Sequence, residues 1–340
     1  MNPSNMSFDG YDDSWYGYGL TFTGTLAIIF GFLGMYFTLF CSPRQFGAFK
    51  YFLFNICLWS FVFDFYTAVL FRPVVLAPAT VMCATGIIST SSYTLGHVYY
   101  ITFVILFGIC SVSVLSAFIY RYCALIGKLD LLLSKKCLVL LAAFHLLYDI
   151  IPAIMNWMES LDKDRIHELI FQQWPNIRSH IVGHGCACVH MSRTSTIIFS
   201  VVQIGEFFIG IPIATILVHK CFNSLNAQKS IMSTKTYQMH RNLLISLIFQ
   251  WAVPVFVLFT PFGLTAIISF GGVENMHFLS MLGIVVGGFH SFCNTMMMIH
   301  LIPHYKHRFY YFIKKRILFR NVVMDISRTT NSVSYLTEKN

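Results

Sequence analysis

The sequence predicts an all-α membrane protein, a bundle of seven transmembrane helices with its N-terminus outside and its C-terminus in the cytoplasm. The chain has 340 residues, of which 56% are hydrophobic and only 11% are charged, whereas about a quarter are charged in a soluble domain. Seven apolar runs each have the length of roughly 20 residues that a membrane helix needs. Eighteen of the 23 Lys and Arg residues fall in one set of alternating connections, and this basic side is expected to face the cytoplasm.

The first segment, residues 1–19, is expected to lie outside the cell. It contains no Lys or Arg and so lacks the positive region of a cleavable signal peptide, which predicts that the first apolar run stays in the mature protein. Asn5 begins an Asn-Met-Ser triplet, a candidate N-glycosylation site. The triplet agrees with the orientation that the basic residues predict.

The transmembrane domain is expected over residues 20–302. Its weakest boundary follows Pro73, because the chain from there to Tyr120 is uncharged and too long for one crossing. Pro78 and Gly86 interrupt it, so we expect a loop or short re-entrant turn before Gly96. The predicted helices cover residues 20–41, 51–71, 96–120, 137–157, 194–219, 242–268 and 278–302.

Residues 303–320 are expected to form an amphipathic juxtamembrane helix on the anionic inner leaflet. Residues 321–340 are polar and rich in Ser and Thr, which predicts a disordered cytoplasmic tail with possible phosphate acceptors. The apolar face of the helix holds Phe309, Phe312, Ile313 and Ile317, and its basic residues are Lys306, Arg308, Lys314 and Lys315.

The stretch 232–261 joins a basic loop to the sixth apolar run. Arg241 is its last charge, and Asn242 begins the span. Pro254 and Pro261 each remove a backbone donor and crowd the carbonyl one turn earlier, so the helix is expected to bend there. A bent helix attached to a cytoplasmic loop could move as a lever.

Three of the ten cysteines are predicted to lie outside, where oxidising conditions favour disulfides. Cys83 precedes the third helix, whereas Cys186 and Cys188 follow the fourth. Cys83 is expected to pair with one of these two, with Cys186 preferred and Cys188 open as the alternative. Either pairing would hold the long outer loop over the mouth of the bundle.

The same loop alternates His184, Cys186, Cys188 and His190 with small or apolar residues. A zinc site needs nitrogen and sulfur ligands of this kind, but in an extended strand the four side chains would share one face and point in parallel rather than converge on a tetrahedron. We therefore expect no metal and no cofactor here.

Four ionisable residues lie within the predicted spans. Such groups are expensive in a bilayer and normally face the bundle interior or a water-filled cavity. They are candidate ligand-binding residues, and a role in only holding helices together is equally open. The four are Asp64, Asp149, Glu206 and His290.

Other function classes have less support. His145 and Asp149 are four residues apart and are expected to be neighbours on one helix face, but no nucleophile pattern or ligand spacing indicates an enzyme. The basic residues lie in short segments between apolar runs, which disfavours nucleic acid as a partner. The two halves show no internal repeat, which lowers the support for a transporter.

Three stretches resemble the nematode serpentine chemoreceptors of class H, with class I as a near alternative. They lie at the start of the second helix, at the entry to the sixth, and in the seventh. The matching residues are Cys41-Ser42-Pro43, Phe49 to Leu53, Asn55, Leu58-Trp59-Ser60 and Asp64; Met232-Ser233, Lys235-Thr236, Gln250, Pro254 and Pro261; and His290, Thr295 and Pro303.

The resemblance implies a chemosensory G-protein-coupled receptor in the plasma membrane of sensory neuron cilia. A small-molecule cue would bind on the outer side, and a heterotrimeric G protein would contact Arg121, Lys235 and Arg241. Tyr120 stands where the family commonly has an acidic residue or Asn, and Pro303 begins Pro-His-Tyr-Lys instead of Pro-Tyr-Arg. These departures place the efficiency of coupling in question, and a channel or transporter remains the alternative.

Overall fold

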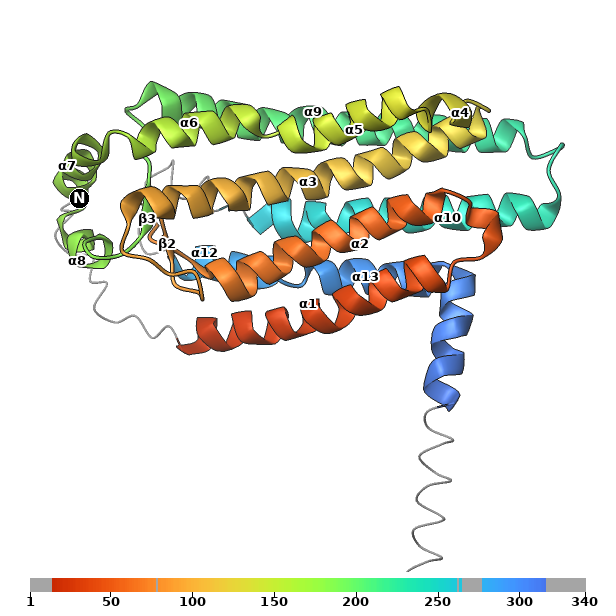
Figure 1. Cartoon of the computed structure of the whole chain (residues 1–340), viewed down its shortest axis with the longest axis horizontal. Coiled ribbons are helices and arrows are strands. Elements are labelled where there is room, and N and C mark those ends of the chain that lie inside the picture. The colour runs from red at the N-terminus through yellow and green to blue at the C-terminus, as the bar shows by residue number, and fades with distance from the viewer. Residues whose placement is uncertain (1–13, 78, 262, 265–276, 316–340) are drawn as a thin grey trace, which may run out of the picture.

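The computed structural model describes residues 14–77, 79–261, 263–264 and 277–315 (Figure 1). Within this part of the chain, seven helices are long and apolar enough to cross a membrane, which confirms the predicted all-α bundle. The helical elements of the spans are α1 (Ser14–Phe40), α2 (Phe49–Phe65) with η3 (Tyr66–Phe71), α3 (Tyr93–Leu125), α5 (Lys135–Leu147) with α6 (Ile150–Ser160), α9 (Thr194–Ala227), α10 (Thr234–Pro254) with η5 (Val255–Phe259), and α12 (His277–Gly287) with α13 (His290–Leu301).

Helix α3 lies in the middle of the bundle (Figure 1) and packs against α2, α5, α6, α9 and α10. Its residues are the most buried of the seven spans. Helices α5, α6 and α9 form one flank and expose large apolar side chains such as Leu140 and Phe208, which suits a surface in contact with lipid chains.

Several helices extend beyond the apolar runs that predicted them. α1 begins at Ser14 instead of residue 20, and α9 continues to Ala227 instead of residue 219. The expected basic loop before Asn242 is wrong, because α10 begins at Thr234, where the Ser233 hydroxyl accepts the backbone N–H of Thr236. Hydropathy detects only the part of a helix that lies in hydrocarbon, whereas caps set where it begins and ends. Residues 265–268 of the predicted sixth span lie outside the described residues.

The segment before α3 is a β-hairpin, which corrects the expected loop or re-entrant turn. β1 (Pro73–Val75) pairs antiparallel with β2 (Val81–Ala84), and β2 pairs antiparallel with β3 (Cys186–Cys188). The three strands form one sheet in the order β1-β2-β3. Short helices α7 (Lys163–Gln173) and α8 (Arg178–Ile181) lie at the same end of the bundle, which we call the sheet end.

The opposite end, which we call the tail end, carries α4 (Leu129–Leu132) and residues 303–315. Residues 303–315 are helical and leave the bundle sideways (Figure 1). The Tyr305 side chain is fully buried, and its hydroxyl lies 2.5 Å from that of Ser42. Tyr305 therefore anchors this helix to the bundle. Asn5, residues 316–320 and the tail 321–340 lie outside the described residues.

Candidate functional site

The fourth span is broken where one of the four predicted intramembrane residues lies. Pro152 has no N–H, so the carbonyl of Tyr148 loses its helical partner, and α5 ends one residue before Tyr148. His145 turns toward α2, where its Nε2 lies 3.3 Å from Asn55 Nδ2. Asp149 turns toward α9 instead, so the expected common face of His145 and Asp149 is wrong.

Asp149 and Glu206, both predicted as candidates, are brought together by this break. Their carboxyl groups lie within hydrogen-bonding range of each other, and Gln203 Nε2 donates to Glu206 Oε2 at 2.8 Å. Asp149 is 3% exposed, and its Oδ1 has no hydrogen-bond partner among the described residues. A Cβ placed on Gly108 of α3 would lie only 1.5 Å from Asp149 Oδ2, so the close approach depends on glycine at that position.

A cavity of about 60 Å³ lies beside this pair, between α3, α9 and the sixth span. Glu206 lines it, as do Tyr148 and Gly108 from the surroundings of Asp149. Pro254, predicted as a bending point, lines it as well. The other lining residues are Phe107, Ser111, Val112, Val114, Leu115, Gly210, Ile211, Ala214, Trp251 and Phe259.

Asp64 and His290, the other two candidates, form a second pair between α2 and α13. The seventh span breaks between Gly287 and His290, which leaves backbone N–H groups at the start of α13 free to bond elsewhere. Asp64 Oδ2 accepts the N–H of Ser291 at 2.5 Å, and His290 Nδ1 lies 3.7 Å from Asp64 Oδ1. Ser60 joins the cluster by accepting Asn294 Nδ2 at 2.9 Å.

The polar partners of these four residues are not among the residues that the sequence predicts. Ser60, Gln203, Ser291 and Asn294 are neutral, so they do not stand out in an apolar run as ionisable groups do. For Gln203 a signal was available, because it precedes Glu206 by three residues and so shares its helix face. The residues paired across helices carried no comparable signal in the sequence.

Pro254 and Pro261 act in different ways in the sixth span. Pro254 closes α10 and is followed by the π-helical turn η5, a local distortion that often accompanies functional sites in helices. Pro261 packs against α12. A Cβ added to Gly283 of that helix would lie only 2.9 Å from the Pro261 Cβ.

The three residues predicted to contact a G protein lie near the tail end. Arg121 of α3 is only 4% exposed, and its guanidinium carbon lies 3.5 Å from the centre of the Phe49 ring. Its Nε and Nη2 have no hydrogen-bond partner within the described ranges. Lys235 and Arg241 are exposed on α10. Arg121 could therefore meet a partner protein only after neighbouring helices separate.

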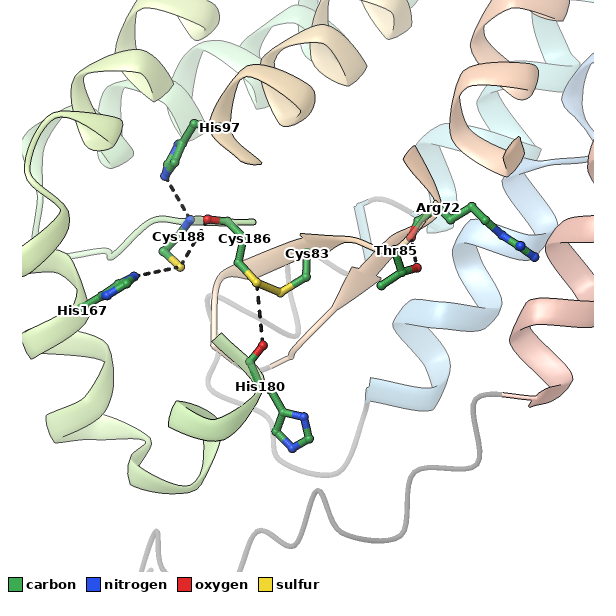
Figure 2. The surroundings of a disulfide bond; sticks show 8 residues. All are labelled: Arg72, Cys83, Thr85, His97, His167, His180, Cys186 and Cys188. Atoms are coloured by element: carbon green, nitrogen blue, oxygen red, sulfur yellow. Dashed lines mark hydrogen bonds between the residues drawn. A yellow bond between two sulfur atoms is a disulfide. The ribbon is translucent and has the colours of Figure 1, made fainter. Parts of the chain in front are cut away.

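At the sheet end, Cys83 and Cys186 form a disulfide between β2 and β3 (Figure 2). Cys188 is a buried free thiol, and its Sγ lies 4.0 Å from His167 Nε2. The Cys188 N–H donates to His97 Nε2 at 3.2 Å, so His97 carries its proton on Nδ1. No group of three or more metal-binding side chains occurs among the residues that the structure describes.

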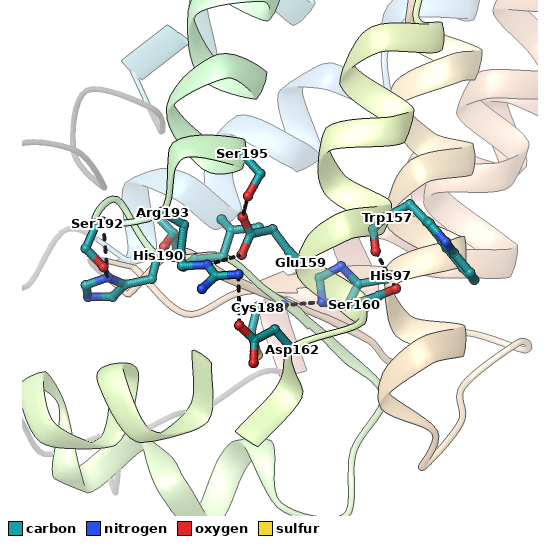
Figure 3. Close-up of polar contacts among 12 residues, drawn as sticks. His97, Trp157, Glu159, Ser160, Asp162, Cys188, His190, Ser192, Arg193 and Ser195 are labelled. Atoms are coloured by element: carbon teal, nitrogen blue, oxygen red, sulfur yellow. Dashed lines mark hydrogen bonds and ion pairs between the residues drawn. The ribbon is translucent and has the colours of Figure 1, made fainter. Parts of the chain in front are cut away.

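Charged residues tie the same loop to the helices (Figure 3). Arg193 Nη2 lies 2.8 Å from Asp162 Oδ2, and its Nε lies 3.7 Å from Glu159 Oε2. The Ser195 hydroxyl donates to the other oxygen of Glu159, which is fully buried. Burial lowers the pKa of the nearby His167 imidazole, and Lys163 adds to this effect. The loop is thus fixed by one covalent bond and by several polar contacts.

Comparison with known proteins gives matches of two kinds, to a family model and to solved structures. Residues 12–315 match the model of a family described as the serpentine type 7TM GPCR chemoreceptor Srh. The fold is similar to the crystal structure of squid rhodopsin, with a TM-score of 0.58 over 87% of this chain and 85% of that chain, at 12% sequence identity. No curated protein matches the chain. At this identity the likeness to squid rhodopsin concerns the fold alone.

Proposed function

The chain belongs to the Srh family of serpentine seven-transmembrane G-protein-coupled chemoreceptors, and on this basis we propose that it binds a small-molecule cue and signals to a heterotrimeric G protein. The family and the fold are those of receptors, not of enzymes. The chain is a multi-pass membrane protein. The family match also supports the class H resemblance over class I.

One observation carries the proposal: Glu206 and Pro254 line the same cavity. Glu206 is an intramembrane polar group suited to contact a ligand, and Pro254 lies at the π-helical distortion of the sixth span. A ligand that fits one arrangement of these helices better than another shifts the population toward it. The other end of α10 carries Lys235 and Arg241, so a change at the cavity could reach a cytoplasmic surface.

We place the sheet end outside the cell and the tail end in the cytoplasm, with the receptor in the plasma membrane of sensory cilia. The excess of Lys and Arg in the tail-end connections supports this orientation. The disulfide at the sheet end supports it independently, because such bonds persist in oxidising compartments. Asn5 would then be available for glycosylation.

The G protein would bind the tail end, where Lys235 and Arg241 are exposed and Arg121 is buried beneath the surface. Separation of the helices around Arg121 would free it from the Phe49 ring. The guanidinium could then contact the partner. Ligand binding at one end and G protein binding at the other are coupled when both favour the same one of two arrangements of the bundle.

The test is a screen of volatile and water-soluble compounds on cells that express the receptor and a G protein reporter. At least one compound should evoke a G-protein-dependent signal. Joint substitution Lys235→Glu and Arg241→Glu should reduce that signal about tenfold at equal surface expression, a loss of about 1.4 kcal/mol in coupling. Lys163→Glu on α7, at the opposite end, is the matched control and should leave it unchanged.

Silence toward every compound despite surface expression would contradict the receptor proposal. The alternative is a channel or transporter of the same fold. Currents or uptake in cells that lack G proteins would support that alternative, whereas a signal without intrinsic flux would exclude it as the main activity.

A further inference from the structure

The cavity beside α9 has an unbalanced set of charges. Asp149 and Glu206 lie in contact at membrane depth, and none of the described lining residues is Lys, Arg or His. Two carboxyl groups held together away from water cannot both be charged unless a cation lies beside them; otherwise at least one of them holds a proton. Asp149 Oδ1 lacks a hydrogen-bond partner in the described part of the chain, so the pair has an acceptor left to offer.

The backbone adds to this excess of acceptors. Pro152 leaves the carbonyl of Tyr148 without a helical donor, and Tyr148 is itself a lining residue. Interrupted helix at membrane depth is tolerated where it is buried in protein or lines a cavity. The break that Pro152 imposes on the fourth span is therefore tolerated beside the cavity, and it leaves the Tyr148 carbonyl without a helical donor.

The remaining walls favour an organic cation over a metal ion. Phe107, Trp251 and Phe259 bring aromatic rings to the cavity, and ring faces attract ammonium groups most strongly when water is excluded. Calcium and magnesium take six or more oxygen ligands, whereas the described residues include no group of three or more metal-binding side chains.

The size of the cavity limits what enters it. Its volume is about 60 Å³, and about 10–15 Å³ of such volume is enough to hold one water molecule. A few water-sized groups therefore fit, which is room for an ammonium group with a short carbon chain. A longer amine would have to extend its chain elsewhere between the helices.

We propose that the cavity between α3, α9 and the sixth span binds the protonated head group of a small primary amine, with Asp149 and Glu206 sharing its charge. This inference rests on the proposed receptor function and names the ligand class for it. The ammonium group donates an N–H bond to the Glu206 carboxyl group, which lines the cavity. Asp149 does not line the cavity and shares the charge through its hydrogen bond with Glu206, and the aromatic rings cover the carbon of the amine.

The proposal is tested by thermal unfolding of the purified full-length receptor in lipid nanodiscs. Methylammonium and propylammonium chloride should raise the Tm in a saturable way, while propan-1-ol and equal concentrations of sodium chloride should not. Glu206→Gln should weaken the amine effect at least tenfold. Glu168→Gln, an exposed carboxylate on α7, is the matched control and should stay within twofold of the wild type.

Three results would overturn the amine site: an equal effect of sodium, an equal effect of the neutral alcohol, or full retention of the amine effect in Glu206→Gln. If Glu206→Gln does not fold, the wild-type comparison of amine with alcohol still decides. Gly108→Ala then serves as a second variant, because its methyl group displaces the Asp149 carboxyl while both acids remain.

Failure of the amine site can be told apart from failure of the receptor proposal. Amine binding without any G protein signal would leave the site standing and contradict the receptor. The opposite result is that no amine binds, while other compounds evoke equal signals in Glu206→Gln and in the wild type. That result would leave the receptor proposal standing and contradict the amine site.

Discussion

The carboxylate of Asp64 on α2 accepts the backbone N–H of Ser291 in the first turn of α13, at 2.5 Å. The break in the seventh span exposes this N–H, and the positive end of the helix dipole favours a negative group beside it. His290 stands at the same turn, 3.7 Å from the other carboxylate oxygen. Asp64 therefore caps a half-helix of another span, which joins the second and seventh spans through a polar contact.

Asp64→Ala should remove that cap and leave buried donors without a partner. We expect a loss of stability of about 3 kcal/mol, within the range for removing one member of a buried pair. Asp64→Asn should cost less, because its amide oxygen can still accept the Ser291 N–H. Thermal unfolding in nanodiscs measures both, with Asp130→Ala on exposed α4 as the control. Equal stability of Asp64→Ala and the wild type would refute the capping role.

The disulfide gives a second prediction. It closes a loop across a sequence separation of 103 residues, and the loss of stability expected from chain entropy when such a bond is removed is about 4.7 kcal/mol. Cys83→Ser and Cys186→Ser should therefore both reduce Tm and surface expression. Cys188→Ser is the matched control, since Cys188 is a free thiol. With this pairing the free-thiol count rises by one in Cys186→Ser and falls by one in Cys188→Ser. The opposite pattern, a rise in Cys188→Ser and a fall in Cys186→Ser, would contradict it.

Acidification should weaken the sheet end. Burial lowers the pKa of His167 and of His190 in the folded protein, so the unfolded chain binds protons there more readily. The stability that neutral His167 and His190 contribute is complete above the ordinary imidazole pKa of about 6.5. It declines as the pH falls through that value toward the lower pKa of these groups in the folded protein.

The measurement is the Tm of the purified receptor between pH 7.5 and pH 5. The wild type should lose stability over this interval, and His167→Gln should flatten the profile. His219→Gln, on the exposed surface of α9, should keep the wild-type slope. A profile in His167→Gln that is as steep as the wild type's would show that His167 does not contribute.

The stacking of Arg121 on Phe49 predicts an effect on basal signalling. Phe49→Leu removes the ring that holds the guanidinium at 3.5 Å and should favour the arrangement in which Arg121 is released. A bias of about 1 kcal/mol would raise basal G protein activity roughly fivefold. Phe52→Leu, one turn away and packed on Tyr120 instead, is the control. Unchanged basal activity in a well-expressed Phe49→Leu receptor would count against this gating role.

Pro254→Ala tests the lever. Alanine restores a backbone donor at the start of η5 and should straighten the span, so we expect normal surface expression with a response to ligand reduced several-fold. The dose–response curve of the G protein signal measures it. If both expression and response match the wild type, Pro254 only shapes the bundle and the lever should be abandoned.

The spans could be predicted from the sequence because burial in hydrocarbon demands long apolar runs, and α3 and α13 lie where such runs occur. The hairpin at Pro73–Val75 could not, since strands of three residues have no usable periodicity. The third strand of the sheet, Cys186–Cys188, lies more than 100 residues later in the chain. Only the fold brings these segments together.

In the candidate site too, single residues can be predicted from the sequence, whereas their contacts depend on the fold. Asp149 and Glu206 are predictable singly, because an ionisable group in a membrane span is costly and conspicuous. Their pairing is not predictable, since it depends on the break that Pro152 imposes and on the space that Gly108 leaves. The common face predicted for His145 and Asp149 is wrong for the same reason, because it holds only in an unbroken helix.

The pairing of β2 with β3 also sets the order of events during synthesis. Cys83 leaves the ribosome 103 residues before Cys186, which at about 5–20 residues per second is a delay of roughly 5–20 s. During that time the hairpin has an unpaired edge and Cys83 an unpaired thiol, while α3, α5 and α6 enter the membrane. The disulfide can close only after these helices have been synthesised and only if both cysteines reach the same side of the membrane. Its formation therefore reports an even number of crossings between Cys83 and Cys186, as the two spans between them provide.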